Sequence, residues 1–257
     1  MNAVRSMVLA GALLAGGFAN AAGLQVAPVT LTLQPAQQAD GLWLSNTGGM
    51  PMNAQVRVFR WTQADGQEKL EPTRALIVSP PMLQLPAEGR QLVRVIRSGP
   101  PPSGMAEESY RVLIDELPLA ETAPPSSSQA LPPPQSPPGA AKGLNFVMQH
   151  SLPIFISPAG AAPNPPQLTW KLLRQGAQAV LEVANSGGTH AQLAGLVFTD
   201  AAGRQTPVHQ GLLGYVLPGS TMRWPLKPSS TTFAAQGRWQ VMINGSTIEQ
   251  DIAPLDR

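Results

Sequence analysis

Short runs of alternating apolar and polar residues recur along this 257-residue chain and are bounded by Gly, Pro, Asn and Asp. Alternation with period two places successive side chains on opposite faces of a strand, whereas an amphipathic helix needs an apolar stripe with a period of 3.6. No such stripe longer than two turns occurs. The pattern therefore predicts an all-β protein, and short strands separated by turn residues favour a sandwich.

The expected strands fall into two groups on either side of a Pro-rich stretch at residues 158–166. Seven strands predict one immunoglobulin-like domain, at residues 23–33, 41–45, 54–62, 76–79, 91–97, 110–117 and 144–156. The rest predict a smaller second sandwich, at residues 168–173, 179–184, 193–199, 215–217, 221–226 and 238–243. We therefore expect two immunoglobulin-like domains in tandem, residues 23–157 and 158–257, hinged at an interdomain cleft.

Local details refine the first domain. The apolar residues of 24–26 and of 29–33 lie on opposite faces of one extended segment, with Ala27-Pro28 between them. A bulge or a crossing between two sheets accounts for this change of face. Asp65-Gly66 predicts a tight hairpin turn. Ser79-Pro80 must be extended and is a candidate for a cis bond.

The N-terminus predicts export. Residues 1–22 combine the charged Arg5, an apolar run at residues 7–15 and small residues before an expected cleavage after Ala21 or Ala22, which is the pattern of a secretory signal. The apolar run is about half of the roughly 20 residues that a membrane-spanning helix needs. The chain has no Cys, so neither disulfides nor a thiolate nucleophile contributes, and the fold must rest on its hydrophobic core.

Charge excludes two broad classes of partner. The 17 basic and 15 acidic side chains nearly balance, and one of the basic ones lies in the signal segment. A nearly neutral chain offers no wide cationic surface for nucleic acid or for an anionic membrane. Any functional charge must therefore be local.

A Pro- and Ser-rich spacer, residues 118–143, leads into an isolated alternating segment. The composition of the spacer predicts a flexible connection. In the segment that follows, Leu144, Phe146 and Met148 recur at period two, so in a strand they share one face. A strand tethered in this way can act away from its own sheet, and its side chains are candidates for binding another molecule. The alternative is ordinary core packing of a last strand.

Several short motifs follow one another in an order typical of one family. They are Asn46-Thr47-Gly48, VRVFRW at 56–61, SPP at 79–81, QLVRV at 91–95, ESYR at 108–111, ELP at 116–118 and SLPIF at 151–155. Their order and spacing resemble the periplasmic pilus-assembly chaperones of the chaperone-usher pathway, over nearly the whole chain after residue 22. The SLPIF ending resembles the archaic branch that serves spore-coat-U-type pili.

The resemblance implies a function and its partners. Such chaperones fold pilin subunits by donor-strand complementation, in which a strand of the chaperone, here residues 144–156, fills the groove of an incomplete pilin. They then deliver the pilin to an outer-membrane usher. The resemblance makes Leu144, Phe146 and Met148 the donor side chains and places the protein in the periplasm. It implies no enzymatic activity, nucleotide, metal or other cofactor.

The sequence departs from the best-known branch at the site that anchors the pilin's terminal carboxylate. That branch uses an Arg in the first strand and a Lys at the end of the donor strand, and the matching residues here are Thr30 and Pro153. A buried carboxylate still needs a cationic partner. If residues 110–117 and 144–150 pair as a hairpin, Arg111 falls roughly opposite His150, which makes it the leading replacement.

Arg94 is the second anchor candidate, although the resemblance favours a structural ion pair between Arg94 and Glu107 or Glu108. For both Arg111 and Arg94 the alternative is a solvated surface cation. The partner that the family takes from the second domain is not evident around residues 234–237.

Other functions have less support. The three histidines show no metal-ligand spacing, and no nucleophile elbow or phosphate-binding loop occurs. A secreted carbohydrate-binding or adhesive β-sandwich remains the alternative function. It would use exposed aromatic residues, whereas Trp170, Trp224 and Trp239 lie in strand patterns and are expected in core or interdomain packing. A pilin would be a single incomplete sandwich.

Overall fold

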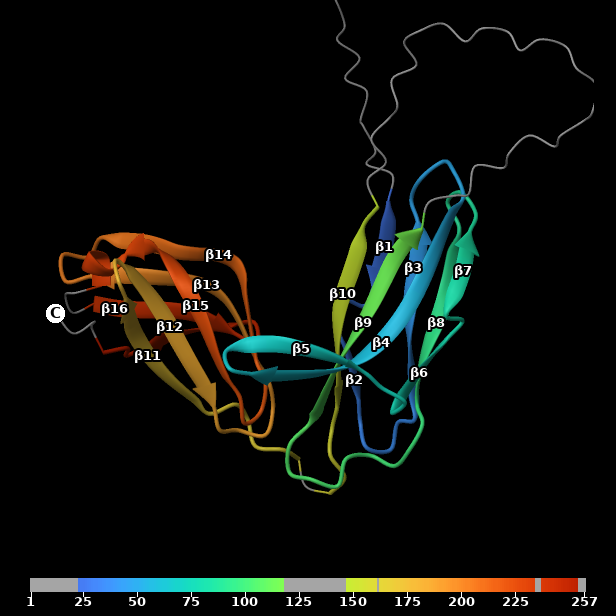
Figure 1. Cartoon of the computed structure of the whole chain (residues 1–257), viewed down its shortest axis with the longest axis horizontal. Helices are drawn as coiled ribbons and strands as arrows, with labels where there is room; N and C mark the ends of the chain where they lie inside the picture. Colours follow the sequence, from blue (N-terminus) through green and yellow to red (C-terminus); the bar gives the residue numbers. More distant parts are fainter. Residues whose placement is uncertain (1–22, 118–146, 161, 234–236, 254–257) are drawn as a thin grey trace, which may run out of the picture.

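The structure is a computed structural model that describes residues 23–117, 147–160, 162–233 and 237–253. Two β-sandwiches lie side by side, and the hairpin that ends in β5 projects from the first toward the second (Figure 1). The only helical element in the described part of the chain is the short 3-10 turn η1 (Ser230–Phe233). The prediction of an all-β fold with two immunoglobulin-like sandwiches is confirmed. No helix among the described residues is long and apolar enough to cross a membrane.

Two sheets form the first sandwich. The first has the order β1 (Leu24–Ala27), β3 (Ala39–Asn46), β8 (Arg90–Arg97) and β6 (Leu76–Ser79). The second has the order β2 (Leu31–Leu33), β10 (Gln149–Ile156), β9 (Glu108–Leu117), β4 (Met52–Ala64) and β5 (Gln67–Pro72), with β7 (Met82–Leu85) also bonded to β4. Their facing side chains form one buried apolar core that includes Leu42, Val93, Val112, Ile114 and Ile154.

The change of face near Ala27-Pro28 is a crossing between the two sheets. Residues before this bond form β1, which pairs with β3, and residues after it form β2, which pairs in parallel with β10. The Ala27-Pro28 and Ser79-Pro80 bonds are both cis. At the predicted hairpin turn Asp65 and Gly66 have φ of 57° and 74°, the left-handed values that a tight turn between β4 and β5 requires.

The second sandwich has its own core. One sheet has the order β11 (Leu168–Gln175), β12 (Gln178–Asn185) and β15 (Thr221–Ser229). The other has the order β14 (Gln205–Val216), β13 (Ala191–Asp200), β16 (Gly237–Ile243) and β17 (Ser246–Gln250). Trp239 is buried in this core, and Trp170 and Trp224 pack against it, so the expectation of core packing is confirmed for all three.

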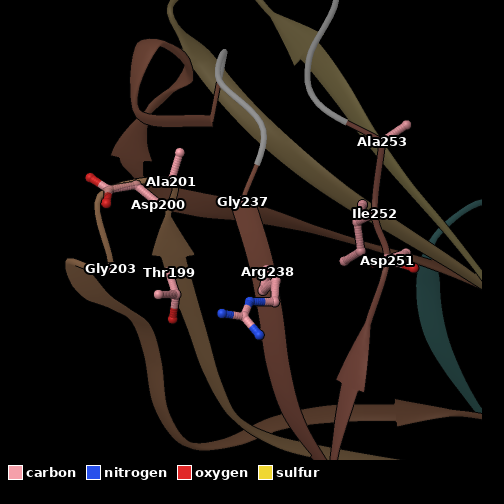
Figure 2. A pocket seen from close by; sticks show the side chains of 9 residues that line it. All are labelled: Thr199, Asp200, Ala201, Gly203, Gly237, Arg238, Asp251, Ile252 and Ala253. Atoms are coloured by element: carbon pink, nitrogen blue, oxygen red, sulfur yellow. The ribbon is translucent and has the colours of Figure 1, made fainter.

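A hollow of about 720 Å³ lies at the end of the second sandwich, where Asp200, Arg238 and Asp251 are among its lining residues (Figure 2). β13 begins at the junction with the first sandwich and reaches Asp200, its tenth residue, about 30 Å along an extended strand. This hollow is therefore remote from the junction between the domains. Among the described residues no group of His, Asp or Glu is arranged to hold a metal ion.

Strand β10 has an edge that is open over half of its length. β9 pairs with it from Gln149 to Ile156, but on the other side β2 pairs only with residues 154–156. Among the described strands none covers the remaining edge, residues 149–153. The Glu116 N–H donates to the Met148 carbonyl, and hydrogen-bonded pairs alternate in an antiparallel ladder. Gln149 and Ser151 therefore direct their backbone groups to the open side.

Candidate functional site

A small aromatic and aliphatic cluster joins the two sandwiches. Trp61 on β4 and Phe155 on β10 pack against Tyr215 and Leu217 of the second sandwich, and all four are buried. The ring centroids of Trp61 and Tyr215 are 5.4 Å apart in an edge-to-face arrangement, a favourable geometry for aromatic pairs. We call the junction around this cluster the cleft, and a hollow of about 230 Å³ there is lined by residues that include Trp61, Gln63 and Leu217.

Strand alternation explains why this cluster forms. Even-numbered residues of β4 and β9, such as Val56, Val112 and Ile114, face the core of the first sandwich. Odd-numbered residues therefore face outward, and on this sheet the outward face meets the second domain. Trp61 and Phe155 are odd-numbered members of their strands, so each leaves its own core and enters the junction.

Arg111 on β9 lies in the same cleft. Its guanidinium carbon is 3.8 Å from the centroid of the Trp61 ring and 5.4 Å from that of Tyr215, positions in which a ring face attracts a cation. Its side chain is only 12% exposed, and Nη2 is 3.4 Å from Oε1 of Glu68 on β5. Burial lowers the pKa of Arg111, and the charge of Glu68 acts in the opposite direction. The cleft thus contains a buried cation among aromatic rings.

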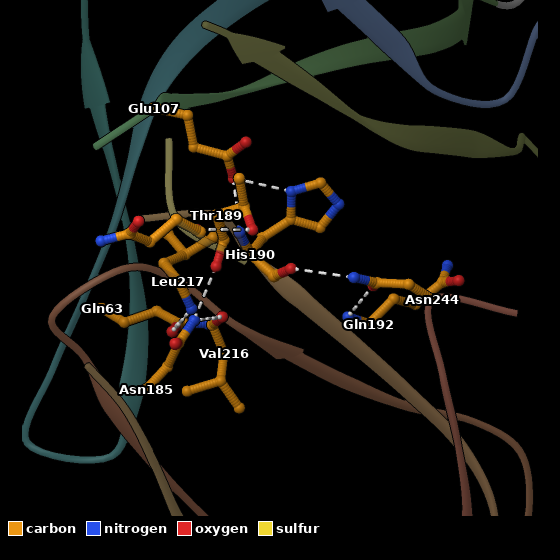
Figure 3. Close-up of polar contacts among 10 residues, drawn as sticks. Gln63, Glu107, Asn185, Thr189, His190, Gln192, Val216, Leu217 and Asn244 are labelled. Atoms are coloured by element: carbon orange, nitrogen blue, oxygen red, sulfur yellow. Dashed lines mark hydrogen bonds and ion pairs between the residues drawn. The ribbon is translucent and has the colours of Figure 1, made fainter. Parts of the chain in front are cut away.

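Hydrogen bonds between polar groups also link the two domains beside the aromatic cluster (Figure 3). The Gln63 side chain donates to the Tyr215 carbonyl and accepts from the Leu217 N–H, both at 2.9 Å. Glu107 Oε1 accepts from the His190 N–H at 2.7 Å and lies 2.6 Å from Nδ1 of the same residue. The His190 ring stacks on Phe155 with centroids 3.5 Å apart. Each contact links the first sandwich to the second.

The structure corrects the expected position of Arg111 along the donor strand. Arg111 is opposite Pro153, and His150 is opposite Ile114. Residues directly opposite each other on neighbouring strands lie on the same face of the sheet. Pairing Arg111 with His150 would therefore put an outward-facing residue of β9 and a core-facing residue of β10 on one face. Core packing of Val112 and Ile114 excludes that register. Arg111 therefore adjoins the position at which the resemblance expected a Lys.

Arg94 occupies a different surface. It lies on β8 opposite Gly41 and Ser79, exposed on the outer face of the other sheet. The expected ion pair with Glu107 or Glu108 was wrong, because Glu107 contacts His190 and Glu108 contacts Arg60. The structure does not bring Arg94 to the cleft.

Arg60, Tyr110 and Glu108 form a network that the sequence analysis missed. Arg60 Nη1 is 2.7 Å from Glu108 Oε2 and 2.9 Å from the Tyr110 hydroxyl, which donates to Glu108 at 2.6 Å. Burial raises the pKa of Tyr110 to about 12, its bond to Glu108 adds to this effect, and the charge of Arg60 opposes it. The sequence signal for this network was the two-residue spacing of Glu108 and Tyr110, which places both side chains on one face of a strand.

Of the three predicted donor side chains, the structure describes only that of Met148. Leu144 and Phe146 lie outside the described residues. Met148 is 55% exposed and directly precedes β10, and its neighbour Val147 is 59% exposed. Since side chains alternate along a strand, Met148 has the same parity as the core residues Leu152 and Ile154.

Comparisons with known proteins agree with this architecture. The profile of the family described as pili and flagellar-assembly chaperone, PapD N-terminal domain, matches residues 23–162. This match covers more than half of the chain. The chain belongs to that family, so the family membership expected from the order of the motifs is confirmed. None of the curated proteins compared with the chain matches it.

Solved structures of pilus chaperones share the fold. The Csu chaperone in complex with a tip adhesion subunit, from archaic pili of Acinetobacter baumannii, is 22% identical with a TM-score of 0.66, covering 90% of this chain and 98% of that chain. The SafB chaperone of Salmonella enterica, solved with the SafA pilin, is 20% identical with a TM-score of 0.57, covering 89% and 96%. The Pseudomonas aeruginosa CupB2 chaperone is 20% identical with a TM-score of 0.53, covering 88% of this chain and 98% of that chain.

The network around Tyr110 predicts a loss of stability at high pH. A tyrosine whose pKa is higher in the folded state binds its proton more tightly there, so its contribution is present below about pH 10 and is lost as pH rises toward 12. Wild type should lose roughly 2 to 3 kcal/mol more unfolding free energy over this interval than Tyr110→Phe. Urea titrations at several pH values measure this. An equal pH dependence in both proteins would contradict it.

The Gln63 contacts predict a local change at the junction. Gln63→Ala removes the acceptor of the Leu217 N–H, and a hydrogen bond of this kind contributes about 1 kcal/mol. The Leu217 amide should exchange its hydrogen roughly fivefold to tenfold faster, while amides in the core of β13 stay unchanged. Gln55→Ala, on the same strand but away from the second domain, is the matched control. Unchanged exchange at Leu217 would show that Gln63 does not fasten the domains.

Proposed function

We propose that this protein is a periplasmic chaperone that captures pilin subunits by donating residues 144–156 to their open groove, and that delivers them to an outer-membrane usher. The observation that carries the proposal is the open edge of β10 beside a cleft with a buried cation. In this proposal residues 23–157 are the pilin-binding domain and residues 158–257 complete the cleft.

Donor-strand binding follows from the chemistry of an unfinished sandwich. A pilin without its last strand exposes an apolar groove and unpaired backbone groups, both of which promote aggregation. A strand added at the edge of β10 could pair with the backbone groups of Gln149 and Ser151, which point away from β9 and which none of the described strands covers. Leu144, Phe146 and Met148 would fill the groove, each stabilising the complex by roughly 1.5 to 3 kcal/mol before ordering costs.

Arg111 is the proposed anchor for the terminal carboxylate of the pilin. It lies beside Pro153, the position of the expected Lys, so a cation on the neighbouring strand compensates for the missing one. A guanidinium binds a carboxylate through two parallel hydrogen bonds. Met148 precedes Pro153 by five residues, about 17 Å along a strand. An anchored carboxylate would therefore fix which groove positions the donor side chains enter.

Binding rather than catalysis accounts for these features. The proposed mechanism uses strand pairing and burial of apolar side chains as its source of free energy, so it requires no nucleotide. The alternative of a carbohydrate-binding sandwich has less support, because the tryptophans of the second domain pack in or against its core instead of forming an exposed platform.

The donor hypothesis predicts a contrast between two adjacent residues. Met148→Asp should abolish recovery of a co-expressed pilin, because a charge cannot enter an apolar groove without a partner. Val147→Asp, equally exposed but on the other face, should retain most of it. Pull-down from periplasm measures recovery, and thermal unfolding confirms that both variants are folded. Loss of folding in Met148→Asp would support core packing of this segment.

The anchor hypothesis predicts a graded response. Arg111→Ala should reduce recovery of the pilin at least tenfold, because a buried carboxylate without a partner costs several kcal/mol. Arg111→Lys should restore part of it, since charge returns without the two-pronged geometry. Refolding assays with purified, denatured pilin in nucleotide-free buffer measure capture. Normal capture by Arg111→Ala would exclude Arg111 as the anchor, and a strict need for ATP would contradict the proposed mechanism.

A further inference from the structure

The ion pair between Arg111 and Glu68 is longer than four other arginine ion pairs among the described residues. Those of Arg57, Arg60, Arg204 and Arg223 have N–O distances of 2.7 to 2.8 Å, and that of Arg111 is 3.4 Å. Arg111 nevertheless has the least exposed side chain of the five. A buried cation needs a close partner more than an exposed one does. Among these five arginines the least exposed side chain thus has the most distant carboxylate.

The described protein groups use only a small part of the hydrogen-bonding capacity of Arg111. A guanidinium has five N–H donors in a fixed planar fork. Among the described residues Arg111 makes one hydrogen bond, from Nη2 to Glu68 at 3.4 Å. Its other close neighbours are the rings of Trp61 and Tyr215, which accept no in-plane hydrogen bonds from the fork. The remaining N–H donors of Arg111 can therefore bind a second carboxylate at the usual N–O distance of 2.7 to 2.9 Å.

Glu68 is placed where it can leave Arg111 easily. It lies on β5, which pairs only with β4 among the described strands and is exposed along its whole length. The Glu68 side chain is 40% exposed, so water replaces Arg111 as its partner at little cost. Glu68 is directly opposite Gln63, which places it on the face of the hairpin that meets the second domain.

We propose that Glu68 is a stand-in carboxylate, which occupies the Arg111 site in the free chaperone and is displaced by the terminal carboxylate of the captured chain. This inference rests on the proposed function of Arg111. Glu68 keeps the buried cation paired before capture. It also lowers the affinity of Arg111 for any other carboxylate, because that carboxylate must first displace Glu68. A carboxylate displaces Glu68 when it approaches the fork bidentately and when its own strand is held by the edge of β10. Glu68 thereby selects for strands that end at the cleft.

Competition between charge variants tests this inference. Mature wild type and Glu68→Gln, carrying different affinity tags, compete for a limiting amount of the denatured pilin recovered in the capture experiment above. Removing the competing charge should favour Glu68→Gln by roughly twofold to fivefold, the range that partly exposed ion pairs span. Glu71→Gln, on the opposite face of β5, is the matched control and should show no advantage. Thermal unfolding confirms that both variants are folded.

The same assay with a pilin whose C-terminal carboxylate is amidated separates the outcomes. The advantage of Glu68→Gln should disappear, because no carboxylate then competes for Arg111. An advantage that persists with the amidated pilin, or that Glu71→Gln shares, would overturn the role of Glu68. If Glu68→Gln shows no advantage while Arg111→Ala still reduces capture, the stand-in role is wrong and the anchor stands. If Arg111→Ala captures normally, the anchor and the stand-in both fail.

Discussion

The register between β9 and β10 is the constraint on which the rest of this molecule depends. It places Val112, Ile114, Leu152 and Ile154 in one core, and alternation then sends their odd-numbered neighbours to the opposite face. A slip of one residue would exchange the two sets. The stability of the first domain and the composition of the cleft are therefore fixed by the same pairing.

The cleft itself is held by apolar packing together with hydrogen bonds to backbone. Trp61 and Phe155 bury their rings against the second domain, and Gln63 bonds to the backbone of Tyr215 and Leu217 on either side of Val216. An amide that bonds to backbone in this way acts like one more step of strand pairing. The two Gln63 bonds therefore do not depend on which side chains stand at positions 215 and 217, whereas the packing of Trp61 and Phe155 does.

The sequence was sufficient for the features that local periodicity controls. The change of face at Ala27-Pro28 and the turn at Asp65-Gly66 were predicted because each depends on neighbouring residues alone. Strand β5 was missed because Gln67–Pro72 is exposed throughout and shows no alternation. The pairing of Arg111 was misjudged because a long spacer between two strands, unlike a tight turn, does not set their register. Contacts such as Glu107 with His190 join residues of different domains, and no local pattern signals them.

Pro153 limits how far another strand can pair along β10. Odd-numbered residues direct their backbone groups to the open edge, so this edge presents N–H donors at Gln149 and Ser151. Proline has no N–H, and β2 occupies the edge from Ile154 onward. A strand added at this edge therefore finds no backbone N–H donor at Pro153, which lies beside Arg111. Under the proposed donor-strand mechanism, the absent N–H of Pro153 would set the last position at which β10 can donate a backbone hydrogen bond to an incoming strand.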